Sequence, residues 1–444
     1  YRTRDEVNQY RDTRDPLEGV LFVALRGARF DAHDFLREAV EKGAAGLLVS
    51  EAGFRAAGGR DAVGAEVDVV LAKDTLPALG ALARHHRRRL GTPVIALTGS
   101  NGKTTTKELL ASVFSRVAPT AYSHGNYNSD IGLPMELLRI RTEHRYGIFE
   151  MGMNRPGEMR LLAELVEPDV GLITNIGTAH IGMVGSQEAI AREQRQIFAF
   201  FTGRQIALIP AGDRYADYLA EGVQGQVVRY SMESAGVSSV ESLGIDGSTL
   251  VCDEGPIHLR LPGAQMVANA IAVLTAARLL DVPFADIREG VERVEPVFGR
   301  SEVIRGEVTI IQDCYNANPE SMRAALELLA STTTQGKRVA VLGAMKELGD
   351  LTSEAHQEMI AFASGLGLDE VILVGDEFVR ALDEHRGRRT ATSTSVAAHG
   401  YDEWTSVVKR TDALGPGDTV LLKGSRALAL ERLTPVLSRS EGER

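Results

Sequence analysis

The sequence predicts an α/β protein built from three domains. The chain has 444 residues, and a domain usually takes about 100–200 residues. Short apolar runs alternate with stretches of helical spacing along most of the chain, which is typical of parallel strands joined by helices. Hydrophobic residues make up 44% of the chain, enough for several buried cores. We expect the domains to span residues 1–88, 89–297 and 298–444.

The first domain is predicted to be a small α/β unit. Residues 20–25 and 46–50 are apolar runs of strand length. Between them, residues 32–42 have helical spacing, and Gly43 suits a helix C-terminus. A basic run at residues 84–90 then precedes a Gly-Thr-Pro linker. We interpret this run as the solvent-exposed end of a helix, because charged runs usually face water.

The second domain is predicted to hold a doubly wound, mostly parallel sheet. Its strands are expected at residues 94–97, 146–150, 170–174 and 204–209. Helical stretches separate them, which implies helices on both faces of the sheet. Residues 221–262 lose the helical pattern and gain Val, Ser and Gly, so we expect a small β-rich excursion there. Residues 266–280 form an Ala-rich helical stretch.

The third domain is predicted to be a second doubly wound, Rossmann-like α/β unit. The strand–helix pattern restarts after Phe298-Gly299-Arg300, which we interpret as a domain boundary. Its strands are expected at residues 308–311, 338–342, 370–374 and 419–422. Each is short and apolar, as expected for strands that are buried on both faces.

Charge and cysteine content exclude several classes of protein. The formal net charge is −11, which argues against a protein that coats nucleic acid, since that needs a basic surface. Cys252 and Cys314 form neither a zinc motif nor a disulfide framework, so we expect a cytoplasmic protein. No apolar run reaches the roughly 18 residues of a membrane span. We also expect a monomer, and a truncated N-terminus because the chain begins without Met.

A glycine-rich turn between a strand and a helix predicts a nucleotide site, as in P-loop ATPases. Residues 98–105 read TGSNGKTT and precede a helix expected from about residue 104. Backbone N–H groups at a helix N-terminus attract phosphate oxygens, and Gly99 and Gly102 permit their close approach. Lys103 would contact the β- and γ-phosphates, and the Thr104 hydroxyl would bind Mg²⁺. The loop is shorter than the usual motif, yet its context predicts that a nucleoside triphosphate binds.

Other polar residues follow the predicted strands and turns, and each has a structural alternative. Glu150 ends a strand and His180 follows another. Either could bind a metal ion, or could be a loop cap and a hydrogen-bonded structural histidine. Asp31 could simply begin a helix. The asparagines at 126, 128, 316 and 318 are turn formers as well as candidate ligands.

The shortened loop and several other strings together resemble the Mur ligases, ATP-dependent amide-forming enzymes of peptidoglycan assembly. Residues 12–14, 21–25 and 29–35 are similar to the family's uridine-nucleotide domain. Further strings similar to the family's motifs follow in the family's order, at residues 126–134, 150–158, 175–180, 268–270, 299–300, 343–356 and 423–426. Residues 315–319, YNANP, resemble the members that add D-alanyl-D-alanine.

This resemblance implies a reaction and a set of site residues. A carboxylate of UDP-N-acetylmuramoyl-tripeptide would become an acyl phosphate, and D-alanyl-D-alanine would displace phosphate, with ATP and Mg²⁺ as cofactors. The catalytic residues implied are Lys103, Glu150, His180 and Arg300. The ATP-binding residues are Gly99, Ser100, Asn101, Gly102, Lys103, Thr104, Thr105, Asn269 and Arg300. The substrate-binding residues implied are Thr13, Arg14, Asp31, Asn126, Asn128, Tyr315, Asn316, Asn318 and Lys423. The metal-binding residues implied are Thr104, Glu150 and His180.

Some positions depart from the family pattern. Gln194 stands where related ligases carry a lysine that is carbamylated in several members. An amide cannot form a carbamate, although Glu193 would supply a carboxylate if the alignment were displaced by one residue. Gln312, Ala344 and Lys346 also differ from the usual residues. These departures keep two alternatives open: a Mur-like ligase with other substrates, and a non-catalytic module that binds nucleotide.

Overall fold

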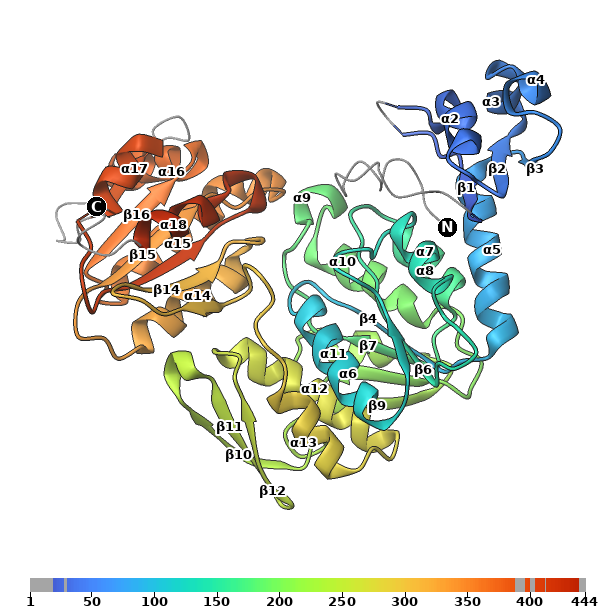
Figure 1. Ribbon diagram of the computed structural model, residues 1–444. Helices are drawn as coiled ribbons and strands as arrows, with labels where there is room; N and C mark the ends of the chain where they lie inside the picture. Colours follow the sequence, from blue (N-terminus) through green and yellow to red (C-terminus); the bar gives the residue numbers. More distant parts are fainter. Residues whose placement is uncertain (1–18, 28–29, 388–395, 400–403, 412, 439–444) are drawn as a thin grey trace.

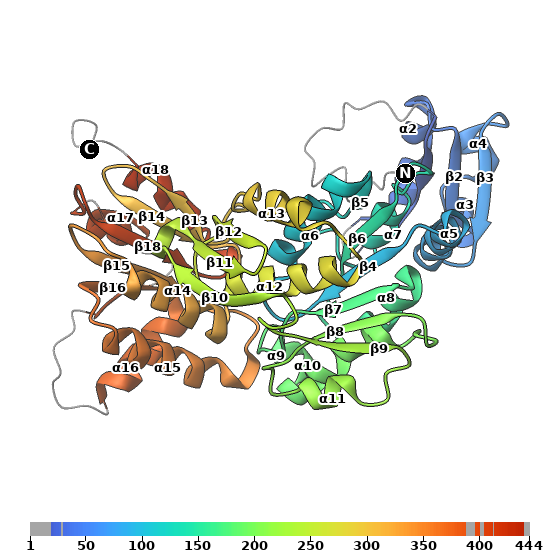
Figure 2. The same cartoon turned by 90° about the horizontal axis from the view of Figure 1, so that it is seen from below.

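The structure is a computed structural model that describes residues 19–27, 30–387, 396–399, 404–411 and 413–438. Figures 1 and 2 both show the C-terminal domain beside the central domain, with the first domain on the far side. The predicted three-domain α/β architecture is confirmed, since separate sheets form in the three parts of the chain. The boundaries near residues 88 and 298 stay predictions.

The first domain holds a three-stranded parallel sheet in the order β1-β2-β3. Its strands are β1 (Leu21–Val23), β2 (Gly46–Ser50) and β3 (Asp68–Ala72). Its helices are η1 (Ala32–Phe35), α2 (Leu36–Glu41), α3 (Glu51–Ala56) and α4 (Gly59–Val63). The predicted helix at 32–42 therefore begins as a 3₁₀ turn, whose N-terminus is capped by the Asp31 carboxylate accepting from His33 N–H.

The central domain holds a six-stranded sheet in the order β5-β6-β4-β7-β8-β9. All its strands are parallel, which confirms the predicted doubly wound, mostly parallel sheet. The strands are β4 (Val94–Thr98), β5 (Thr120–Tyr122), β6 (Tyr146–Glu150), β7 (Val170–Ile173), β8 (Ile206–Pro210) and β9 (Gln226–Tyr230). From β4 the chain passes to the edge strand β5, returns to β6 beside β4, and then crosses to β7, β8 and β9 on the other side. Such a switch point leaves a crevice at the carboxyl end of the strand, where open α/β sheets bind ligands.

Helices cover both faces of the central sheet, each with its own apolar core. One face carries α6 (Lys103–Val117), α12 (Ala264–Leu279) and α13 (Phe284–Glu292). The other side carries α7 (Gly132–Leu137), α8 (Glu158–Val166), α9 (Ile181–Val184), α10 (Gln187–Gln194) and α11 (Ala216–Ala220). The β-rich excursion is confirmed as an antiparallel sheet of β10 (Val237–Ser242), β11 (Ser248–Cys252) and β12 (Gly255–Leu259), with η3 (Gly244–Asp246) in one of its turns.

The helix α5 (Thr75–Leu90) joins the first domain to the central one, and it corrects one prediction. The basic run at 84–90 does not form a wholly solvent-exposed face, because α5 packs against α7 and α8. Arg87 is only 8% exposed. Its guanidinium donates to the Val166 carbonyl and to Asp169, both at 2.8 Å. Arg84 pairs with Glu167 at 2.6 Å. These arginines therefore hold α5 on the central domain.

The C-terminal domain holds a second six-stranded sheet, in the order β13-β14-β18-β15-β16-β17. Only its edge strand β13 (Glu302–Ile304) is antiparallel among the described strands. The others are β14 (Thr309–Asp313), β15 (Arg338–Gly343), β16 (Glu370–Val374), β17 (Val396–His399) and β18 (Thr419–Lys423). The helical segments are α14 (Pro319–Ser331), η4 (Gly349–Leu351), α15 (Thr352–Gly365), α16 (Asp376–Gly387), α17 (Trp404–Thr411), η6 (Arg426–Leu428), η7 (Leu430–Leu433) and α18 (Thr434–Leu437). The predicted Rossmann-like unit is confirmed.

The two large sheets direct the carboxyl ends of their strands toward a shared space. Residues at or just beyond the ends of β4 and β6 line a pocket together with residues at the ends of β14 and β18. Within the part of the chain that the structure describes, no helix has the length and apolar character needed to cross a membrane.

Candidate active site

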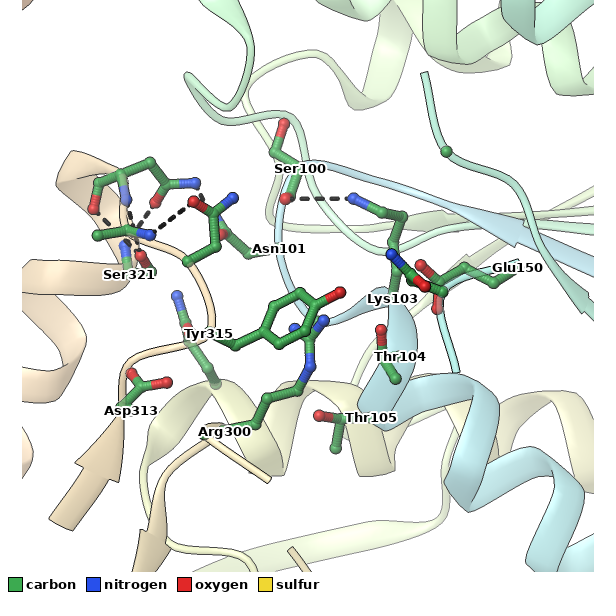
Figure 3. Close-up of a pocket in the computed structure, with 18 of the residues that line it drawn as sticks. Ser100, Asn101, Lys103, Thr104, Thr105, Glu150, Arg300, Asp313, Tyr315 and Ser321 are labelled. Atoms are coloured by element: carbon green, nitrogen blue, oxygen red, sulfur yellow. Dashed lines mark hydrogen bonds between the residues drawn. The ribbon is translucent and has the colours of Figure 1, made fainter. Parts of the chain in front are cut away.

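A cavity of about 270 Å³ lies between the central and C-terminal domains. It brings together most of the predicted site residues, many of which Figure 3 draws around it. Those that line it are Ser100, Asn101, Gly102, Lys103, Thr104, Thr105, Asn126, Asn128, Glu150, His180, Asn269, Arg300, Tyr315, Asn316, Asn318 and Lys423. The residues predicted to bind ATP, metal and substrate thus line one pocket, although they come from two domains.

The loop at 98–105 needs its two glycines for different contacts. Gly99 has a φ of 145°, and a Cβ there would lie 1.8 Å from the Thr174 hydroxyl oxygen. Gly102 has a φ of 82°, and a Cβ there would lie 2.3 Å from Asn269 Oδ1. Only glycine fits both the backbone conformation and the space. The loop is therefore pressed between the end of β7 and the helix α12, with its N–H groups at the start of α6.

Lys103 lies at the first position of α6, and its ammonium group turns back over the loop. Its Nζ donates to the Gly99 carbonyl at 2.6 Å. It also lies 3.4 Å from the Ser100 carbonyl, a hydrogen bond that Figure 3 draws. Burial lowers the pKa of Lys103, and the nearby Glu150 carboxylate works against that shift. A phosphate group in the cavity would offer this ammonium stronger, charged acceptors than two carbonyls.

Two buried oxygens in the cavity lack any hydrogen-bond partner within the described residues. They are the Thr104 hydroxyl oxygen and Glu150 Oε2. Asn128 Nδ2 donates to the other carboxylate oxygen, Glu150 Oε1, at 2.7 Å. A buried carboxylate oxygen without a partner is costly unless a ligand meets it. A hydroxyl and a carboxylate oxygen are the hard donors that Mg²⁺ prefers, so this pair fits a magnesium ion.

The described residues hold no cluster of three or more His, Cys, Asp or Glu side chains with the geometry of a metal site. Phosphate oxygens and water would therefore have to complete the coordination of an ion bound by Thr104 and Glu150, which is the usual situation for Mg²⁺ in nucleotide sites.

His180 begins α9 and lines the same cavity. Its Nδ1 lies 2.6 Å from Oε2 of Glu347, a residue of the C-terminal domain. Burial and the positive charge of Lys103 lower the pKa of His180, and Glu347 works in the opposite direction. The residue is therefore more than a satisfied core histidine, because its ring connects the cavity with the other domain.

Arg300 and Tyr315 form the wall that the C-terminal domain contributes (Figure 3). The Arg300 guanidinium carbon lies 4.3 Å from the centre of the Tyr315 ring, a distance that fits a cation–π contact. Arg300 Nε is buried and has no partner within the described residues. Its position in the cavity leaves this donor available to an anionic ligand.

The YNANP segment acts both as a turn former and as a contact between domains. The Asn318 side chain caps α14 by accepting from Ser321 N–H at 2.9 Å. Its Nδ2 also donates to Asn101 Oδ1 of the phosphate loop at 2.8 Å. Both interpretations of this asparagine therefore hold at once, and the contact brings the segment directly against the nucleotide loop.

Four predicted substrate residues are not shown to face a ligand. Lys423 lines the cavity, but its Nζ is already bonded to Asp313 at 2.9 Å and to the Asn316 carbonyl at 2.7 Å. Asp31 lies in the first domain, outside the residues that line the cavity, and caps η1. Thr13 and Arg14 lie outside the described residues. Their roles stay predictions.

Comparison with known proteins identifies the family. The model of the Mur ligase middle domain matches residues 97–277, and that of the Mur ligase glutamate ligase domain matches residues 299–426. The chain belongs to the Mur ligase family. UDP-N-acetylmuramoyl-tripeptide–D-alanyl-D-alanine ligase of Treponema pallidum is 41% identical to it over 96% of this chain and 92% of its own. The ligase of the same name from Escherichia coli is 34% identical, with the same coverage.

Solved structures of Mur ligases also resemble this chain over nearly its whole length. MurF from Acinetobacter baumannii matches with a TM-score of 0.83 and 32% identity, covering 96% of this chain and 92% of its own. MurF ligase from Thermotoga maritima, solved in complex with ADP, matches with a TM-score of 0.79 and 27% identity, covering 96% of both chains.

The departures of this Mur ligase from the family pattern can now be placed. Gln194 is 1% exposed, and its amide carbonyl accepts from Ser100 N–H at 3.2 Å when the amide is oriented to satisfy both ends. Glu193 accepts from Met159 N–H at 2.9 Å, so it caps α8 and does not replace the missing charge. Gln312 donates to Glu302 and accepts from Thr434, which is a structural role.

Sequence reasoning assigned no role to several residues that complete the site of this Mur ligase. Asn175 accepts from Asn101 N–H at 3.0 Å and so fixes the phosphate loop. Asp313 pairs with Lys423, and Glu347 with His180. All three lie inside or beside the strings that resemble the family, so the sequence could have marked them as candidates. It could not have shown which residue each of them contacts.

Proposed function

We propose that this Mur ligase joins D-alanyl-D-alanine to UDP-N-acetylmuramoyl-tripeptide, yielding UDP-N-acetylmuramoyl-pentapeptide, ADP and phosphate. The observation that carries the proposal is the contact between Asn318 and Asn101. It brings the segment typical of D-alanyl-D-alanine adders against the ATP loop, so the amine and the activated carboxylate would meet in one cavity. The relatives that match nearly the whole chain carry this activity in their names.

The residues of the cavity suit this chemistry. The substrate carboxylate attacks the γ-phosphorus of ATP, and ADP leaves with the electron pair of the broken bond. The dipeptide amine then attacks the acyl phosphate, loses a proton and displaces phosphate. Phosphoryl transfer requires positioning and neutralisation of charge more than covalent participation of the protein. Lys103 and Arg300 provide two positive charges to the same cavity.

We propose that Thr104 and Glu150 hold Mg²⁺, with His180 close enough to contribute. The unpartnered oxygens of Thr104 and Glu150 support this assignment. When bound, the ion would neutralise charge on the phosphate groups. We also place the reaction in the cytoplasm, since its substrates are nucleotides and both described cysteines are buried free thiols.

Phosphate release measured with purified protein tests the function. We expect release only when ATP, the UDP-linked tripeptide and D-alanyl-D-alanine are all present, together with a product whose mass equals that of the pentapeptide. The matched control omits D-alanyl-D-alanine alone. ATP binding without phosphate release under any combination would contradict the proposal and would indicate a non-catalytic nucleotide-binding module.

The neutral Gln194 favours a second candidate, a Mur-like ligase with other substrates. Its amide contacts the phosphate loop where a charged group is usual in related ligases. A panel of acceptor amines and UDP-linked acids separates the two candidates. Turnover confined to substrates outside peptidoglycan synthesis would favour the second candidate, and turnover with D-alanyl-D-alanine would exclude it.

Replacing Gln194 with lysine should make the enzyme respond to bicarbonate. The side chain at this position reaches Ser100 of the phosphate loop, and a lysine there can be carbamylated, which adds a negative charge near the metal site. We expect a lower Mg²⁺ concentration for half-maximal activity, and only when bicarbonate is present. Gln196→Lys, two residues on and partly exposed, is the matched control. An unchanged Mg²⁺ response in Gln194→Lys would show that residue 194 does not influence the ion.

A further inference from the structure

The contact between His180 and Glu347 crosses from the central domain to the C-terminal domain. The two residues are 167 positions apart in the sequence, and Nδ1 and Oε2 lie 2.6 Å apart. Both residues also have a left-handed backbone, with φ of 63° for His180 and 64° for Glu347. Side chains other than glycine rarely adopt this conformation, and such strain persists where the surrounding structure enforces it, commonly at functional sites.

The chemistry of the pair fixes which nitrogen of the neutral ring carries the proton. A carboxylate in its ionised form can only accept, so Nδ1 must carry the proton that it donates to Glu347. In the neutral imidazole this leaves Nε2 with its lone pair. A carboxylate that orients a histidine in this way is a common partner of functional histidines.

The surrounding backbone allows this pairing only when the two domains are docked. Gly182 N–H donates to the Glu347 carbonyl at 2.9 Å, and α9 packs against η4. A Cβ on Gly182 would lie 2.5 Å from the Gly349 nitrogen, so any larger side chain would hold the domains apart. The close contact between Gly182 and Gly349 thus brings the Glu347 side chain within hydrogen-bond distance of His180.

Stability does not explain the pair. The Glu347 side chain is 53% exposed, and at that exposure even a full ion pair would stabilise a fold only weakly. Two strained backbones oppose that small gain. The arrangement is better explained by what it does to the ring that lines the cavity.

We propose that Glu347 is a positioning residue for His180: upon domain docking it fixes the imidazole as the Nδ1–H tautomer, with Nε2 unprotonated. The site is then complete only when the C-terminal domain is in place. The consequence for turnover rests on the proposed function, but the tautomer of His180 does not.

Nuclear magnetic resonance of ¹⁵N-labelled histidine side chains reads the tautomer directly. The His180 signal is identified as the one that His180→Asn removes. In the wild-type protein with a non-hydrolysable ATP analogue, we expect the Nε2 shift of an unprotonated nitrogen. In Glu347→Ala that shift should move toward the average of the two tautomers, while Glu347→Gln, which retains an acceptor oxygen, should keep most of it.

Two further variants separate positioning from general damage. Asp350→Ala removes an exposed carboxylate three residues away and should leave the His180 signal unchanged. Gly182→Ala keeps Glu347 but blocks docking, so it should change the signal as Glu347→Ala does. An Nε2-protonated ring in the wild-type protein, or a signal that Glu347→Ala leaves unchanged, would overturn the proposal.

Steady-state kinetics with the two proposed substrates provides the second readout. Glu347→Ala should lower kcat by about 10- to 100-fold, the usual effect of losing such a partner, with the KM for ATP nearly unchanged. Glu347→Gln should recover part of the loss. An unchanged kcat in Glu347→Ala would also overturn the proposal. A wild-type protein without turnover that still shows the expected tautomer shift would contradict the proposed function and leave the positioning role supported.

Discussion

Replacing Lys103 with alanine is expected to lower kcat by about 10³-fold, because a half-buried positive charge beside the transferred phosphoryl group would be lost. The ammonium lies over the phosphate loop at the first position of α6, where it donates to the Gly99 and Ser100 carbonyls. Lys103 lines the same pocket as Glu150 and Arg300. Phosphate release measured at saturating concentrations of all three substrates checks the prediction.

The matched control is Lys107→Met, one helical turn further along α6. The Lys107 side chain is fully buried and pairs with Glu108 at 2.8 Å. Its removal should lower the melting temperature while retaining most of kcat, because Lys107 does not line the cavity. A Lys103→Ala variant that retains more than about a tenth of wild-type kcat would contradict a role in charge neutralisation.

Replacing Glu150 with glutamine should raise the Mg²⁺ concentration for half-maximal activity by at least tenfold and lower kcat by about 10²-fold. The amide has the shape of the carboxylate and can still accept from Asn128, so the local structure is kept. What is lost is the negative charge on the oxygen that has no protein partner. Activity titrated with Mg²⁺, together with isothermal titration of ATP at fixed Mg²⁺, measures both effects.

Glu193→Gln is the control for this prediction. Glu193 is another buried carboxylate, but it accepts from Met159 N–H at the start of α8 and does not line the cavity. We expect a loss of about 1 kcal/mol in the free energy of unfolding and an unchanged Mg²⁺ response. If instead Glu193→Gln shifted the Mg²⁺ midpoint and Glu150→Gln did not, the metal would be bound by the other carboxylate.

The sequence was sufficient to predict most of the fold and much of the cavity. Apolar runs of strand length place β4, β6 and β7, and the carboxyl ends of parallel strands converge at one edge of the sheet. This convergence is why Lys103, Glu150 and His180, far apart in the chain, could be expected together. The conformation of the glycine-rich loop also depends on residues close together in the chain, so the sequence could predict it as well.

The contacts between domains could not be predicted in this way. Asn318 meets Asn101 across 217 positions, and Glu347 meets His180 across 167. The periodicity of a sequence predicts helices and strands, but it does not show which side chains of two different domains will be in contact. The same limitation explains the wrong prediction for α5. A run of arginines indicates solvent exposure until the carboxylates of α8 and the turn after it are known to lie against it.

The arginines of α5 also determine where this protein can be divided. A fragment that begins at the predicted boundary, residue 89, would lack Arg84, Arg87 and Arg88, which together neutralise Glu164, Glu167 and Asp169. Three carboxylates would then lie close together without their partners and repel one another. We therefore expect a fragment of the central domain that starts before α5, at residue 74 or earlier, to be more stable than one that starts at residue 89.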